Sequence, residues 1–339
     1  MNQTAIVVLN WNSFDDTINC IESLISQTTV PDIIVVDNNS SDNSKDMLQS
    51  YVSENDNSQV TLILNSVNSG YSGGINVGIR DALDKGYHYI GTLNPDAIAD
   101  RHWTSELLQT LTSTKQPCGI ATGLMAKSNH TSIDTTGEQY SIWGIPGPRF
   151  RDQPIDIAPN TEEYIFASTG GGFIARADML REIGLFDEKF FMYFEDVDLC
   201  FRAQLAGYKV RYTPKAIAYH KVSASTNKVP GLAIYNTFKN LPILFIKNVP
   251  LGLMPTILPR FTLAYVLILG NAIVHGKGKY ALSGCLKTFI LIPHALRERK
   301  HIQSSRKVSN AYISSVILHD IPPEQTGLRK FRAFFTGKQ

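Results

Sequence analysis

The chain has 339 residues, of which 43% are hydrophobic and 18% charged, so it can bury a core and is not compositionally disordered. None of its four cysteines forms a CxxC pair, which leaves zinc and thioredoxin-type chemistry without support and fits a reducing compartment. The net charge is +2, but the acidic residues are distributed unevenly along the chain: only three of the 30 lie after residue 220. A basic C-terminal part of this kind usually binds phosphate, in nucleic acid or at a membrane surface.

The N-terminus, MNQTAIVVLNWN, has no basic segment, and its apolar run Ala5–Leu9 is too short for a signal peptide. That run is instead typical of a buried strand. We therefore expect the catalytic part to be cytoplasmic.

Strands and helices alternate over the first ~125 residues, which predicts a doubly wound, mostly parallel sheet. Ligands bind such sheets at the carboxyl ends of the strands. The predicted strands are Ala5–Leu9, Ile33–Val36, Val60–Leu64, Tyr87–Leu93 and Gly119–Leu124, and the helices are Ser13–Ile25, Ser72–Leu83 and Trp103–Leu111.

Residues 127–165 are rich in Ser, Thr, Pro and Gly, and we expect loops and short strands there, over the active face. The remaining pattern predicts helices at Arg176–Ile183 and Asp196–Leu205 and strands at Lys209–Tyr212 and Ala216–Tyr219.

The character of the chain changes near Pro230, where apolar patches begin to alternate with Lys and Arg. Residues 261–274 are uncharged, but they are fewer than the ~20 needed to span a bilayer, and Pro255 and Pro259 argue against a simple span. The pairing of apolar and basic residues is typical of helices lying in a membrane interface. The alternative is a packed helical subdomain with a solvated basic face.

Polar residues follow each predicted strand. Asp37 can read the donor edge of a base or ribose, or can simply hold a turn and cap a helix. The stretch from Asn68 through Gly70, Gly73 and Gly74 can bring backbone N–H groups to a diphosphate, although it is neither a Walker A loop nor GxGxxG.

Asp96 stands where a bound diphosphate would need a Mg²⁺ or Mn²⁺ counter-ion, unless it only caps the next helix. His220 ends a predicted strand and is either a metal ligand or a structural residue. Glu195, Asp196 and Asp198 follow an aromatic run at a helix start, where the helix dipole alone would favour acids. Aromatic walls and neighbouring acids would also raise the pKa of a carboxylate toward that of a general base.

Together these stretches resemble the inverting family 2 glycosyltransferases, and specifically their rhamnosyltransferase-like branch. The resemblance covers about residues 4–225. The matching stretches are IVVLNWN from Ile6, VVDNNSSD from Val35, Asn68–Gly78, LNPD from Leu93, TGGGF from Thr169, GLFDE from Gly184 and FEDVDLCFR from Phe194.

The resemblance implies a GT-A nucleotide-diphospho-sugar transferase fold, with a C-terminal helical extension that is basic and apolar. By the same resemblance, Asp196 is the catalytic base and Asp96 binds a divalent cation, Mg²⁺ or Mn²⁺, with His220 as a second ligand. Asn94 stands where the family's first DxD aspartate would be, so the ion meets fewer negative charges. The residues expected to bind the donor are Asn10, Asp37, Asn39, Asn68, Gly70, Gly73, Gly74 and Asn94, and those expected at the acceptor are Gly171, Gly172 and Glu195.

We expect a catalytic domain over residues 1–228 and a membrane-associating helical region over residues 229–339. The predicted reaction transfers a sugar, L-rhamnose from dTDP-L-rhamnose, to a glycan hydroxyl on a lipid-linked polysaccharide intermediate at the inner face of the cell membrane. The alternatives are a UDP-hexose or galactofuranose donor, transfer to a lipid phosphate, and an inactive membrane-bound scaffold. Nucleic acid is not an expected partner, because the basic residues alternate with apolar runs rather than with exposed aromatics. An oligomer is compatible with the sequence.

Overall fold

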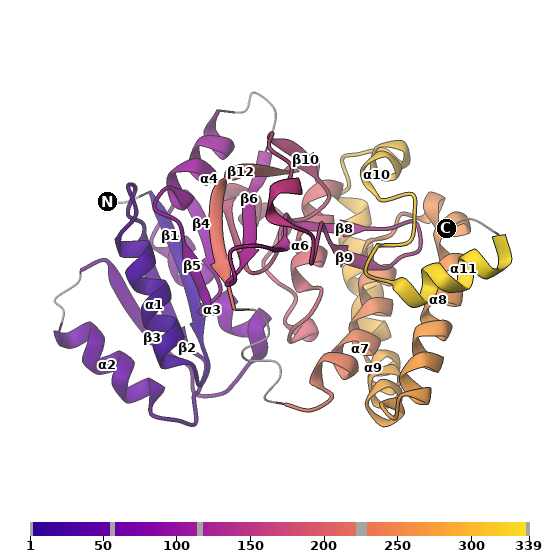
Figure 1. The fold of residues 1–339 in the computed structure, drawn as a ribbon, viewed down its shortest axis with the longest axis horizontal. Coiled ribbons are helices and arrows are strands. Elements are labelled where there is room, and N and C mark those ends of the chain that lie inside the picture. The colour runs from indigo at the N-terminus through magenta and orange to yellow at the C-terminus, as the bar shows by residue number, and fades with distance from the viewer. Residues whose placement is uncertain (1–2, 55–57, 114–117, 222–228, 337–339) are drawn as a thin grey trace.

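The computed structural model describes residues 3–54, 58–113, 118–221 and 229–336. A ten-stranded sheet forms its centre, in the order β10-β12-β6-β11-β4-β1-β2-β3, with β5 paired to β12 and β7 to β6 (Figure 1). The first half alternates as expected: β1 (Thr4–Asn10), α1 (Phe14–Ile25), β2 (Asp32–Asp37), α2 (Ser44–Glu54), β3 (Val60–Leu64), α3 (Gly70–Asp84) and β4 (Tyr89–Leu93). The four strands are parallel, with Val7 opposite Ile34 on one side and Thr92 on the other.

The side chains of β1 show why helices cover both faces of the sheet. Val7 packs into one hydrophobic cluster with Ile79 of α3, whereas its neighbour Val8 packs into a second cluster with Leu24 of α1. Successive strand residues point to opposite faces, so a continuous apolar strand needs helices on both sides. The α/β fold expected from the sequence is confirmed.

The second half of the sheet departs from simple alternation. Its elements are β5 (Ala97–Ala99), α4 (Trp103–Thr112), β6 (Cys118–Lys127), β7 (Ile133–Thr135), β8 (Glu138–Tyr140), β9 (Pro146–Pro148), η1 (Ile155–Ile157), β10 (Glu163–Ile165), β11 (Gly172–Arg176), α5 (Ala177–Ile183), η2 (Glu188–Phe190), α6 (Glu195–Leu205) and β12 (Lys209–His220). β11 lies antiparallel between β4 and β6, which separates two strands that are close in sequence. The sheet is therefore mixed, though mostly parallel.

Strand β12 corrects the prediction of two separate strands. It is a single strand whose register against β6 shifts between Thr213 and Ile217, around Pro214. Proline cannot donate a ladder hydrogen bond and is tolerated at such bulges, which is why the sequence looks like a break.

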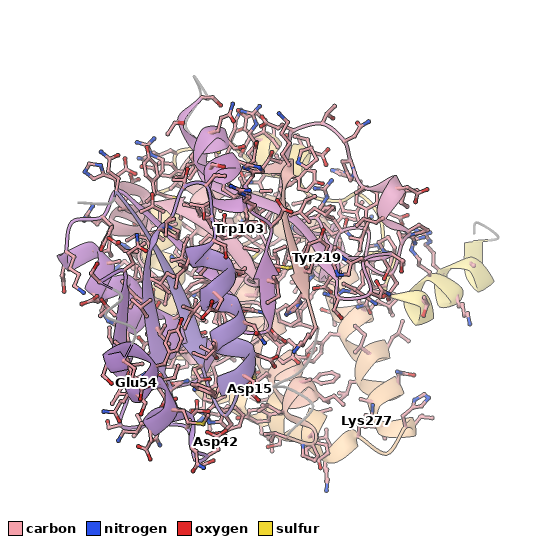
Figure 2. The ribbon with its side chains drawn as sticks, turned by 60° about the vertical axis from the view of Figure 1, so that its left-hand side comes forward. Asp15, Asp42, Glu54, Trp103, Tyr219 and Lys277 are labelled. Atoms are coloured by element: carbon pink, nitrogen blue, oxygen red, sulfur yellow. The ribbon has the colours of Figure 1, made fainter. Side chains whose placement is uncertain are left out.

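The C-terminal part is helical: α7 (Leu232–Asn248), η4 (Leu251–Leu253), α8 (Met254–Val274), α9 (Gly278–Ser304), α10 (Asn310–Val316) and α11 (Thr326–Thr336). Figure 1 shows α7, α8 and α9 gathered on the side of the molecule opposite α1 and α2. Figure 2 shows Lys277, between α8 and α9, standing apart from the sheet. The hydrophobic cluster that contains Val7 continues into α7 and α8. Residue 228, the predicted end of the catalytic domain, lies outside the described residues, so that boundary stays a prediction.

The two prolines that argued against a simple span, Pro255 and Pro259, lie within α8 and do not interrupt it. Pro255 occupies the first turn, where its missing N–H costs nothing, and the helix continues through Pro259. Together with the preceding turn, Leu251–Val274 is the one helix in the described chain that is long and apolar enough to cross a membrane.

Candidate active site

The turn after β2 is built around Asp37, which is 1% exposed. Its Oδ1 accepts hydrogen bonds from Nδ2 of Asn10 (2.7 Å) and from the hydroxyl of Ser40, and its Oδ2 accepts from the Ser40 N–H (3.1 Å). Asn39 takes a positive φ of 59° in this turn. Figure 2 shows Asp42, at the end of the turn, at the same edge of the molecule as Asp15 of α1. Asp37 thus holds the turn, a structural role that stands beside its predicted contact with a base.

The glycine loop that follows β3 is joined to this turn by Asn38, a residue that the sequence did not single out. Its Nδ2 donates to Oδ1 of Asn68 and to the Gly70 carbonyl, both at 3.0 Å. Gly70 (φ +72°) must be glycine, because a Cβ there would stand 2.5 Å from the Phe191 carbonyl oxygen. The structure therefore brings the predicted donor residues of two strands together at one edge.

Gly73 and Gly74 lie inside the first turn of α3, where both are buried. A Cβ on Gly74 would stand 2.4 Å from Leu9, so this glycine allows the helix to lie close to β1. Among the first amides of α3, the Gly70 N–H already donates to Asn68 Oδ1 and the Ser72 N–H to the Phe191 carbonyl. A diphosphate at this helix would have to use other N–H groups.

Asp96 and His220 lie together beyond the ends of β4 and β12. His220 Nε2 is 3.0 Å from Asp96 Oδ1 and 3.3 Å from Asn94 Nδ2. Its other ring nitrogen, Nδ1, is 2.8 Å from Oδ2 of Asp134, which is 3% exposed. Burial disfavours the imidazolium, but hydrogen bonds to Asp134 and Asp96 outweigh it and raise the pKa of His220 to about 9.

This pair fits a divalent cation. A carboxylate oxygen and an imidazole nitrogen are suitable ligands for Mn²⁺, and a carboxylate on the far nitrogen is the usual outer partner of a metal-bound histidine. No cluster of three or more His, Cys, Asp or Glu side chains within the described ranges has metal-binding geometry, so donor phosphates would have to complete the shell. An open pocket of about 730 Å³ borders Asp96 on the α1 side.

The Gly170–Gly172 segment connects Asn94 to Asp196. The Asn94 N–H donates to the Gly171 carbonyl (2.9 Å), and the Gly170 N–H donates to Asp196 Oδ2 (2.7 Å). A Cβ on Gly170 would stand 3.2 Å from that carboxylate oxygen, and one on Gly172 would stand 3.1 Å from Met125. The glycines therefore let β11 enter the sheet with Asp196 directly against its backbone.

Asp196 itself is partly buried at the first turn of α6. Its Oδ1 accepts from the Val197 N–H (2.8 Å). Burial raises the pKa of Asp196, while the backbone hydrogen bonds from Gly170 and Val197 hold it back. Next to it, Glu195 is 7% exposed, and its Oε2 has no hydrogen-bond partner within the described residues. Burial and the charge of Asp196 raise the pKa of Glu195 to about 8. The predicted direction agrees with the structure for Glu195 and Asp196, but the charges of Lys247 and Arg202 outweigh burial and lower the pKa of Asp198.

Three residues before these acids adopt left-handed backbone conformations: Phe191, Tyr193 and Phe194 have φ values of 63°, 71° and 70°. Such a conformation costs roughly 1–2 kcal/mol for a non-glycine residue, so surrounding contacts must stabilise it. The sequence showed the aromatic run but gave no signal of this backbone geometry.

Those contacts come from α7. Nδ2 of Asn240 lies 2.8–3.0 Å from the carbonyl oxygens of Phe190, Met192 and Tyr193. Nζ of Lys239 donates to the Phe190 carbonyl (3.0 Å), and burial lowers the pKa of this amine to about 8. A helix of the C-terminal part thus holds the turn that leads to Glu195 and Asp196.

A buried ionic network joins the same helix to α6. Lys247, 1% exposed, pairs with Asp198 Oδ1 (2.9 Å) and with Asp187 Oδ2 (2.6 Å). Asp198 also accepts from Arg202 Nε at 2.9 Å, and Asp187 from His294 Nε2 at 2.8 Å. Asp198 therefore supports the helix that carries Asp196.

Two carboxylates that the sequence did not identify also belong to this site. Asp134 orients His220, and Glu138 of β8 lies close enough to Asp196 to feel its charge. Burial, together with the charge of Asp196, raises the pKa of Glu138 well above its usual range. Both come from residues 127–165, whose weak periodicity hid them.

Comparison with known proteins agrees with this geometry. The family model described as "Glycosyl transferase family 2" matches residues 5–180, and "Glycosyl transferase family group 2" matches residues 155–275. A low-salt glycan biosynthesis hexosyltransferase, Agl10 of Haloferax volcanii, is 26% identical over 250 residues, which are 71% of this chain and 74% of that protein. The poly-beta-1,6-N-acetyl-D-glucosamine synthase of Staphylococcus epidermidis is 24% identical over 60% of this chain, which spans only 45% of the synthase.

Solved structures show the same fold at low identity. GalNAc-T7, crystallised with UDP, GalNAc and Mn²⁺, superposes with a TM-score of 0.62 at 14% identity, over 90% of this chain and 58% of that one. Residues 1–349 of S. aureus TarS superpose with a TM-score of 0.54 at 14% identity, over 90% and 91% of the two chains. Because the family model covers more than half of the sequence, the chain belongs to glycosyl transferase family 2.

Proposed function

We propose that the chain is an inverting, metal-dependent hexosyltransferase and that Asp196 is its general base. The observation that carries this proposal is the fixed carboxylate of Asp196, whose two oxygens accept hydrogen bonds from the Gly170 and Val197 N–H groups. A base held in one orientation beside the sheet edge can take the proton of an acceptor hydroxyl as its oxygen attacks the anomeric carbon. Attack from the face opposite the leaving group inverts that carbon.

The other residues divide the remaining tasks. Glu195 is buried with an unpartnered Oε2, which can accept a hydrogen bond from a hydroxyl of the acceptor. Gly171 and Gly172, at the start of β11, would lie beside the acceptor. Asp96 and His220 would hold the cation, which neutralises the diphosphate leaving group when bound. Asp134 keeps His220 oriented.

The test of this mechanism is Asp196→Asn. Removing a general base should slow turnover by roughly 10²–10⁴-fold while leaving donor nucleotide affinity unchanged. Asp46→Asn, an exposed acid on α2, is the matched control and should retain full activity. Loss of donor affinity with turnover retained would reassign Asp196 to donor binding, and a product with a retained anomeric configuration would refute the inverting mechanism.

For the donor we propose dTDP-L-rhamnose, on the resemblance of the sequence motifs. Relatives with other sugars in their names, including an N-acetylglucosamine synthase, leave UDP-hexoses and galactofuranose as competing donors. Calorimetry with dTDP, UDP and GDP, with and without Mn²⁺, decides among them. Best binding of dTDP, only with metal, supports the proposal. Best binding of UDP would refute dTDP-L-rhamnose as the donor and leave the proposed mechanism unchanged.

For the acceptor we propose a glycan hydroxyl on a lipid-linked intermediate, with the protein bound at the inner face of the cell membrane. The rival acceptor, a lipid phosphate, would give a far more acid-labile product. Support for the membrane comes from α9, which buries one row of side chains against α7 yet also exposes an apolar row. The exposed fractions of Leu286, Phe289 and Ile290 are 67%, 68% and 68%.

The charge around that row favours an anionic membrane. Residues 221–297 contain no acidic side chain, and Lys277, Lys279 and Lys287 stand near the exposed apolar residues. Co-flotation with vesicles that contain anionic lipid, but not with neutral vesicles, is the expected result. Binding that survives high salt and carbonate extraction would instead indicate insertion of Leu251–Val274.

A further inference from the structure

We propose that a second pocket, between the start of α8 and the end of α9, binds the phosphate group of an anionic lipid. This pocket has a volume of about 430 Å³. It is lined by three cations, Arg299, Lys300 and Arg306, and by no acidic residue of the described chain. The inference deepens the membrane contact proposed above and rests on it for the source of the phosphate.

The two arginine side chains are held in place by hydrogen bonds to the protein. Nη1 of Arg299 donates to the carbonyls of Ile246 (2.7 Å) and Val249 (2.8 Å), at the end of α7. Nη1 of Arg306 donates to Asn310 Oδ1 at 2.6 Å. An ordered guanidinium loses little entropy on binding phosphate, which it can meet with two parallel hydrogen bonds.

Arg299 also has donor capacity left. Its Nη2 is buried and has no hydrogen-bond partner within the described residues. Buried donors without partners are rare in folded proteins. Because this nitrogen is closed to solvent, a phosphate in the pocket would reach it only after neighbouring side chains move. Lys300, one residue on, is exposed and adds a mobile ammonium at the pocket mouth.

The rim of the pocket distinguishes a lipid from a free anion. Leu251 and Leu296, 72% and 53% exposed, stand beside the cations. Leu296 continues the apolar row of α9 that includes Phe289 and Ile290. A lipid whose phosphate contacts the arginines would therefore have its acyl chains along an apolar surface. Free phosphate has no acyl chains and would gain nothing from that surface.

The place of the pocket along α9 separates it from the active site. Thr288, in the first part of α9, donates to the Lys239 carbonyl (3.0 Å), near the turn that precedes Glu195. Lys300 lies 12 residues after Thr288, which is about 18 Å along a helix. The pocket thus serves to hold the protein on the membrane and is not the site of the reacting substrate.

The test compares two double variants of the full chain that lose equal charge: Lys300→Gln with Arg306→Gln in the pocket, and Lys277→Gln with Lys279→Gln at the far end of α9. Binding is measured to vesicles of phosphatidylcholine with phosphatidic acid or with phosphatidylserine at matched surface charge. We expect the unmodified protein to prefer phosphatidic acid several-fold, the pocket variant to lose that preference, and the control variant to keep it. Lys300→Gln alone, which removes no hydrogen bond of the structure, should weaken the preference and guards against misfolding of the double variant.

Equal losses in both double variants with no lipid preference would overturn the pocket and leave diffuse charge as the cause. Titration with dihexanoyl phosphatidic acid and with inorganic phosphate distinguishes the source of the phosphate. Tighter binding of the short-chain lipid supports the proposal, and equal binding overturns the lipid assignment. Binding of the short-chain lipid without vesicle binding would support the pocket while refuting the proposed membrane contact.

Discussion

Helix α7 and the pair α8–α9 come from the same acid-poor stretch of sequence, yet the structure uses them in opposite ways. α7 turns polar groups inward: Lys239, Asn240 and Lys247 are 4%, 1% and 1% exposed and contact the turn and helix that carry the predicted base. α9 turns apolar groups outward, with Phe289 and Ile290 each 68% exposed. Similar composition thus conceals one helix that belongs to the active site and another suited to an interface.

The largest expected effect tests how firmly α7 belongs to the catalytic part. Lys247→Met leaves Asp187 and Asp198 as buried charges without this partner, which should lower the free energy of unfolding by about 3–5 kcal/mol. Urea denaturation measures it. The control is Lys307→Met, which removes an exposed pair with Glu182 and should cost less than about 1 kcal/mol. Equal effects would mean that α7 is only loosely attached.

The second prediction concerns the turn that α7 holds. Asn240→Ala removes the amide shared by three carbonyls, and the resulting shift of Asp196 should lower kcat by roughly 10–100-fold. Nucleotide affinity should stay unchanged, because the donor edge lies on other elements. Asn236→Ala, one turn earlier on α7 and bonded only within it, is the control. If both variants lose kcat only in proportion to stability, Asn240 is a packing residue.

The third prediction uses pH. Because the folded state raises the pKa of Glu195 from 4.5 to about 8, the folded protein binds more protons than the unfolded chain between these values. The free energy of unfolding should therefore fall as pH rises through that window, by up to about 1.4 kcal/mol for each pH unit. Glu195→Gln should flatten this slope in unfolding measured from pH 5 to 9. Glu188→Gln, on a half-exposed acid, should leave the slope unchanged, and an unaltered slope in Glu195→Gln would contradict the shift.

The smallest effect concerns the outer face of α9. Leu286→Ser should weaken binding to anionic vesicles by about 1–2 kcal/mol, the value of burying the part of this side chain, 67%, that is exposed in the free protein. Leu64→Ser, an exposed leucine on β3, should have no effect. If the two variants bind alike, the apolar row does not meet the membrane, and α9 differs from α7 only in being exposed.

The sequence predicted the sheet edge well because its signals are local. Each strand from β1 to β4 ends at a polar residue or is followed directly by one, and parallel strands bring those ends to one edge, so Asp37 and Asp96 were identified from position. The glycines at 170–172 and the acids at 195–198 were identified by their resemblance to a known family.

What the sequence missed depends on contacts between distant segments. Asn240 looks like any polar residue in a helix until its three carbonyl partners, about 50 residues earlier, are seen. Asp134 lies in a loop-rich stretch without periodicity and gains its role only where β12 brings His220 beside it. Pro255 and Pro259 argued against a simple span, but a local rule does not show that α8 continues through Pro259.

The position of β11 also orders the folding of the protein. β4 and β6 emerge from the ribosome long before residues 172–176, yet each needs β11 as its neighbour in the sheet. Until that strand is synthesised, the edge of β4 stays open to other chains. The Asn94–Gly171 hydrogen bond and the Gly170–Asp196 contact form only after β11 has been inserted. The strands β1 to β4 are therefore synthesised before the candidate active site can be complete.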